Sequence, residues 1–76
     1  MNNERRKKIN EAVSLIEEAR SIIEDATAEE TEAYENMPES LQYSERGELA
    51  QEAVNNLEYS ESSFDELLGY LEEAKQ

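Results

Sequence analysis

Residues 36–47 read Asn36-Met37-Pro38-Glu39-Ser40-Leu41-Gln42-Tyr43-Ser44-Glu45-Arg46-Gly47, and this stretch decides the fold of the chain. It holds the only proline and one of the two glycines, and acidic sequence of helical character flanks it on both sides. Because proline disfavours a helical conformation at the residue before it, a helix that enters this stretch should end near Asn36. We therefore expect 36–47 to be a short helical turn between two antiparallel helices.

The sequence before the turn predicts a helix over residues 4–35. Its apolar residues recur at steps of three and four, which places them in one stripe along a helix. The stripe consists of Ile9, Ala12, Val13, Ile16, Ala19, Ile22, Ile23 and Ala26. Leu15 and Ile22 widen it, so this helix should contact more than one other helix.

The sequence after the turn predicts a second helix over residues 48–74. Ala50, Leu57, Phe64 and Leu71 recur every seven residues, with a polar layer at Ser60 and Glu61. Ser44 is the expected N-cap, although the pattern also allows a helical start at Pro38. Gly47 marks either an early-turn residue or a close approach of another backbone segment.

The charge balance limits the classes of partner. Lys and Arg number 7 against 20 for Asp and Glu, which gives a net charge of −13. Such a chain should be repelled by nucleic acid and anionic membranes and attracted to basic protein surfaces. Arg5, Arg6, Lys7 and Lys8 form one basic cluster, which an antiparallel hairpin should bring beside Glu72 and Glu73 near the other terminus. No apolar stretch is as long as a membrane span, and no signal-peptide core follows the basic start. We therefore expect a cytoplasmic protein.

The composition also argues against an enzyme. The chain has no histidine and no cysteine, which removes the commonest general base and the commonest transition-metal ligands. Its serines have no nearby base. The paired acids, such as Glu17–Glu18 and Glu72–Glu73, lack the patterns of carboxylate metal sites and fit a solvated helix surface. We therefore predict a non-enzymatic protein with no metal and no cofactor.

The turn contains the one candidate ligand site in the sequence. Arg46 beside a helix start, with Ser44, Gly47 and free backbone N–H groups, could bind an anion or phosphate. Tyr43 could stack on a base. In the alternative interpretation Ser44 caps the helix, Leu41 and Met37 close the end of the hairpin, and Arg46 pairs with a neighbouring glutamate.

A hairpin this small buries little apolar surface by itself. Because disulfides are impossible without cysteine, self-association is the remaining way to enlarge the core. We expect a homo-oligomer, most simply a dimer of hairpins with four helices. The predicted oligomer core consists of Ile9, Val13, Ile16, Ile23, Val54, Leu57, Phe64, Leu68 and Leu71.

Residues 36–42 and 44–47, together with the basic start and the Ala50–Leu57 stretch, resemble small acidic helical proteins encoded by phages and prophages. The resemblance implies a single hairpin domain over residues 1–76 and an accessory role in the cytoplasm of a bacterial host. The first hypothesis is an inhibitor that blocks a host defence protein through acidic helical faces. The alternatives are an oligomeric sponge for a nucleotide immune signal, with pockets built from 36–47, and a phage assembly or scaffolding protein.

Overall fold

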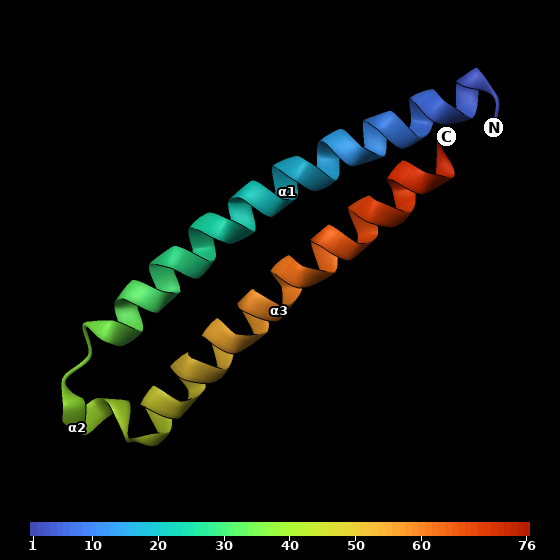
Figure 1. Ribbon diagram of the computed structural model, residues 1–76. Helices are drawn as coiled ribbons and strands as arrows, with labels where there is room; N and C mark the ends of the chain where they lie inside the picture. Colours follow the sequence, from blue (N-terminus) through green and yellow to red (C-terminus); the bar gives the residue numbers. More distant parts are fainter.

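The computed structural model describes all 76 residues and confirms the all-α hairpin. Helix α1 runs over Asn3–Glu35, the short α2 over Glu39–Gln42, and α3 over Glu45–Ala74. The two long helices lie antiparallel, so both chain ends meet at one end of the rod and α2 caps the other (Figure 1). The rod measures 58 × 15 × 12 Å. None of the helices has the length and apolarity needed to cross a membrane.

Side-chain caps explain where the long helices begin. At the start of α1, the side-chain oxygen of Asn2 accepts a hydrogen bond of 2.9 Å from the backbone N–H of Arg5. The predicted start of the second long helix at residue 48 was wrong, because α3 begins at Glu45. Ser44 is its N-cap, as expected, and accepts from the N–H of Gly47 at 3.4 Å. Glu45 and Glu48 then lie in the first turn, where the helix dipole favours negative charge.

The turn itself is held by short-range hydrogen bonds. The carbonyl of Pro38 accepts from the N–H groups of Leu41 and Gln42 at 2.8 and 3.1 Å, which builds the single turn of α2. The side-chain amide of Gln42 donates back to the carbonyl of Tyr34 at 3.2 Å. This contact ties α2 to the last turn of α1 and limits how the chain can leave that helix.

Gly47 is one of only two buried residues, and both of the roles expected for it are present. It lies in the first turn of α3, and a Cβ atom there would overlap the carbonyl oxygens of Leu41 and Gln42. Its φ is not positive, so the requirement for glycine is one of space and not of backbone conformation. The turn can therefore fold back tightly on α3 only because this position has no side chain.

The seam between α1 and α3 is apolar but thin. No hydrophobic side chain in the chain is fully buried, and the second buried residue is Thr27. The Thr27 hydroxyl donates to the carbonyl of Ile23 in its own helix at 2.7 Å, so its burial leaves no unpaired donor. All nine residues of the predicted oligomer core are half-buried here. Their further burial by a second chain stays a prediction.

Polar contacts at the open end set the register of the two long helices. The Arg6 guanidinium donates to the backbone carbonyl of Lys75 at 2.9 Å. The Lys75 ammonium in turn donates to the side-chain oxygen of Asn10 at 2.9 Å. No ion pair forms between the basic cluster and Glu72 or Glu73, and Glu72 pairs with Lys75 of its own helix end at 3.0 Å. The cluster therefore meets the negative end of the α3 dipole through a carbonyl and not through carboxylates.

The two glycines make a matched pair for testing the turn. Replacing Gly47 by alanine forces the backbone of the turn away from α3, and we expect a loss of about 1–3 kcal/mol in the free energy of unfolding. Gly69 lies inside α3 with open space where a Cβ would be. Gly69→Ala should therefore raise the free energy of unfolding by about 0.5–1 kcal/mol. Denaturant titration followed by far-ultraviolet circular dichroism measures both; equal effects of the two substitutions would contradict the role given to Gly47.

Candidate functional site

Of the four residues of the predicted turn site, two are engaged in the helix cap and two are exposed. Ser44 and Gly47 are engaged in folding, because the Ser44 hydroxyl donates to the Leu41 carbonyl and accepts from the Gly47 N–H. Tyr43 is 80% exposed. Arg46 is also exposed and takes part in none of the ion pairs, so the glutamate pairing suggested for it is not formed. Of the two hydrophobic residues expected to close the hairpin end, Met37 is half-buried and Leu41 stays largely exposed.

The hollow in the surface lies away from the turn, on the seam between the long helices. It has a volume of about 230 Å³ and is lined by Ile23, Ser60, Ser63, Phe64 and Leu67. The sequence placed Ile23 and Phe64 in the core but did not predict a hollow beside them. The signal was the polar layer at Ser60 and Glu61, since a short serine side chain in an otherwise apolar seam leaves space unfilled.

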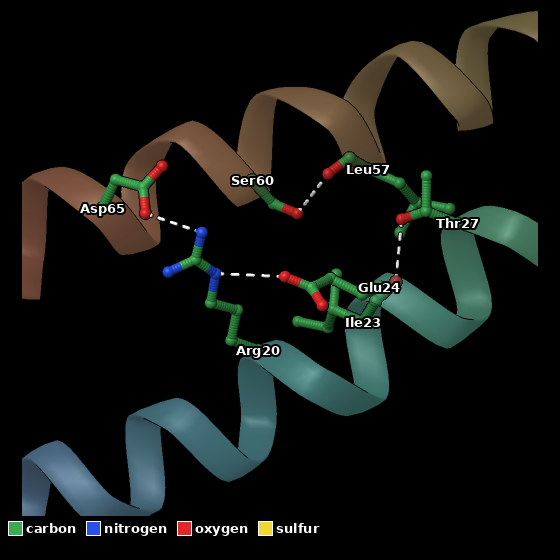
Figure 2. A network of polar contacts seen from close by, with 7 residues as sticks. All are labelled: Arg20, Ile23, Glu24, Thr27, Leu57, Ser60 and Asp65. Carbon is green, nitrogen blue, oxygen red and sulfur yellow. Dashed lines mark hydrogen bonds and ion pairs between the residues drawn. The ribbon is translucent and has the colours of Figure 1, made fainter.

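The serines of the hollow contribute little polarity to it. The Ser60 hydroxyl donates to the carbonyl of Leu57 at 2.6 Å, as Figure 2 shows. The Ser63 hydroxyl donates to the carbonyl of Tyr59 at 3.3 Å. Both donors are thus used within α3. The hollow offers Ile23, Phe64 and Leu67 as its binding surface, which suits an apolar side chain better than a nucleotide.

Arg20 organises a second feature, an acidic cluster that spans both long helices. Its guanidinium contacts Glu24 on α1 at 3.2 Å and Asp65 on α3 at 2.7 Å (Figure 2). Glu17 lies one turn before Arg20, and Glu61 lies one turn before Asp65, so helical spacing puts them on the same side. The acidic cluster consists of Glu17, Glu24, Glu58, Glu61 and Asp65. Its members are exposed except Glu61, which is half-buried.

The acidic cluster and the hollow lie on opposite sides of the hairpin. Residues two apart in a helix differ by about 200° in direction. Asp65 of the cluster is two residues from Leu67 of the hollow, and Glu24 of the cluster is two residues from the exposed Ile22. The hairpin thus carries the acidic cluster on one side and the hollow, with exposed apolar residues near it, on the other.

The acidic cluster is a charged surface and not a metal site. No three carboxylates come close enough together to hold a metal ion. The carboxylates follow the surface of regular helices, so they are spaced along the rod instead of converging on a point. One guanidinium among five carboxylates leaves the cluster with a large excess of negative charge. What this arrangement can do is attract a cationic surface over several turns of helix.

The cross-helix contact of Arg20 with Asp65 should be worth little in stability, because the pair lies at the surface and the Asp65 side chain is 64% exposed. A double-mutant cycle with Arg20→Gln and Asp65→Asn should give a coupling free energy of about 0.2–1 kcal/mol at low salt. The coupling should shrink as salt rises towards about 1 M. Chemical denaturation of the four proteins measures it; a coupling well above this range would mean that the pair is central to the fold.

The comparisons with known proteins add no relative to this description. No protein-family model, no curated protein and no solved structure matches the chain. The resemblance of residues 36–47 to phage-encoded acidic proteins therefore stays an expectation from those residues.

Proposed function

We propose that this is a non-enzymatic binding protein whose acidic cluster docks on a basic surface of another protein. The observation that carries the proposal is the arrangement around Arg20. One guanidinium bridges Glu24 on α1 and Asp65 on α3, and helical spacing puts three further carboxylates on the same side of the rod. A partner with regularly spaced lysines and arginines, including one that normally holds a phosphate backbone, fits this surface.

The physics of the chain favours a protein partner over a nucleic acid. The net charge of −13 repels phosphate backbones and draws in cationic surfaces from beyond contact distance. The helices hold the carboxylates at fixed spacing, so binding would not have to order the chain that carries them. Charge complementarity of this kind mainly raises the rate of association and selects among partners.

The biological setting of the proposal comes from the resemblance alone. Small acidic phage proteins suggest a host bacterial cytoplasm and an accessory role in which the chain blocks a host defence protein. The electrostatic docking mechanism does not depend on that setting. An assembly or scaffolding role in the phage particle would require the chain to be abundant in purified virions.

Two variants of equal charge test the docking surface. The first replaces Glu17, Glu58 and Glu61 of the acidic cluster by glutamine. The second replaces Glu18, Glu32 and Glu66, which are exposed and lie outside the cluster. Each variant moves the net charge from −13 to −10. Tagged wild-type and variant proteins are used for affinity capture from a bacterial lysate, and the captured partner is then purified and titrated.

We expect the partner to bind wild type and the second variant with similar affinity and the first variant at least about tenfold more weakly. The affinity of wild type should fall steeply between about 50 mM and about 500 mM salt, because screening weakens attraction between exposed charges. Affinity that is independent of salt, or equal loss in the two variants, would contradict docking through the acidic cluster.

A nucleotide-binding role is the second candidate, and one observation favours it. Arg46 has no ion-pair partner, and Tyr43, three residues before it, is 80% exposed. A guanidinium and an exposed ring at one end of the rod could hold a phosphate and a base when another chain completes the pocket. The engagement of Ser44 and Gly47 in the helix cap leaves Tyr43 and Arg46 as the residues available for this role.

Calorimetric titration tests this candidate against cyclic nucleotides and ADP-ribose derivatives. A nucleotide sponge should release or absorb measurable heat with one of them, and Arg46→Ala should abolish that heat without changing the helical circular dichroism. Arg5→Ala, which removes an exposed cation at the opposite end of the rod, is the matched control. A silent titration with every compound, or binding that survives Arg46→Ala, rejects the nucleotide role.

A further inference from the structure

The side of the hairpin opposite the acidic cluster carries exposed hydrophobic side chains. Leu15 and Ile22 are seven residues apart on α1, and Leu49 and Leu67 are eighteen apart on α3, so each pair shares one side of its helix. Their exposed fractions are 60%, 65%, 61% and 43%. Leu67 also lines the hollow, which places the hollow on this side. We call Leu15, Ile22, Leu49 and Leu67 the apolar strip.

The hairpin exposes more surface than a compact single chain of this mass. A compact monomer of 8.7 kDa exposes about 4,700 Å², whereas this chain exposes 5848 Å². The radius of gyration is 17.3 Å, against about 11 Å for a compact domain of this length. The excess of about 1,100 Å² exceeds the roughly 800 Å² that each partner contributes to an interface of standard size.

The acidic cluster disfavours one of the two sides through which two copies could meet. Two chains of −13 repel each other, and the repulsion is strongest where the acidic clusters approach. Contact through the apolar strips places the two clusters on the outer sides of the pair. Ala19, Ala26 and Ala33 lie beside the strip on α1, and their small side chains allow a second helix to come close.

We propose that two copies of this chain pack through their apolar strips about a two-fold axis, with Ile22 of each copy entering the hollow of the other. Ile22 is the most exposed member of the strip and adjoins Ile23, which lines the hollow. It also lies within one turn of the middle of α1. A two-fold interface requires a surface that fits a second copy of itself. A projecting side chain next to an apolar hollow, near the centre of the rod, gives such a surface. This pairing does not rest on the proposed docking of the acidic cluster.

Sedimentation equilibrium of the full chain tests the pairing. Wild type should sediment with twice the chain mass of 8.7 kDa at about 100 µM and dissociate on dilution. Ile22→Lys and Leu15→Lys should each raise the dissociation constant at least about tenfold, because every substitution acts twice in a symmetric pair. Ala28→Lys makes the same addition of charge one turn after Glu24 of the acidic cluster. It should leave the dissociation constant nearly unchanged or lower it.

Salt gives a second readout with a definite sign. Screening reduces the repulsion between two anionic copies, so the dimer should tighten as salt rises, while the docking of a basic partner should weaken. Ile22 and Leu15 are exposed within one chain, so their variants should keep the helical circular dichroism of wild type. A single-chain mass at about 500 µM, or a dimer that Ile22→Lys and Leu15→Lys weaken no more than Ala28→Lys does, would overturn the proposal.

Discussion

The close approach of two backbone segments at Gly47 is the constraint on which the rest of the hairpin depends. The carbonyl groups of Leu41 and Gln42 occupy the space that a side chain at Gly47 would need. Only with that space free can the chain turn back within a single helical turn and start α3 at Glu45. The antiparallel arrangement of the two long helices follows from this reversal (Figure 1), and the polar contacts at the open end then set their register.

The arrangement of helices was predictable because it depends on local signals. A single proline, two long stretches without strong helix breakers and a regular apolar spacing are sufficient to predict a hairpin. The range 48–74 put the start of α3 three residues late, although an early-turn position was one of the two roles expected for Gly47. In the structure it belongs to the first turn of the helix, where the Ser44 cap determines the start.

The surface features were less accessible from the sequence, for a physical reason. Whether Ser60 and Ser63 lie beside Ile23 depends on how the two helices rotate against each other, and the spacing within each helix does not determine that rotation. Arg20 illustrates the same limit. Its neighbour Glu24 is given by helical spacing, but its contact with Asp65 requires the register of the folded hairpin. Spacing alone did suggest the second apolar side, through Leu15 and Ile22.

The turn, which is the most distinctive stretch of sequence, is mostly occupied with folding. The hydroxyl of Ser44 and the backbone N–H of Gly47 form the helix cap. The distinctive residues of this stretch are therefore needed to build the turn, and most of them are not available to a ligand. The charged and apolar sides of the long helices are left free for contact with other molecules. The sequences of these helices do not reveal such contacts, because amphipathic acidic helices of many proteins look alike.

Pairing through the apolar strip leaves the acidic cluster on the other side of the rod free to dock on a partner. If two copies meet through their apolar strips, their acidic clusters face outwards on opposite sides of one particle. A partner with repeated basic surfaces would then be held at two points, and the second contact would form at a high effective concentration. An anionic cluster on the same side as the apolar strip would instead oppose pairing and be covered by it. The two sides are separated by about 200° around the axis of each helix, and this separation allows self-association and docking to occur together.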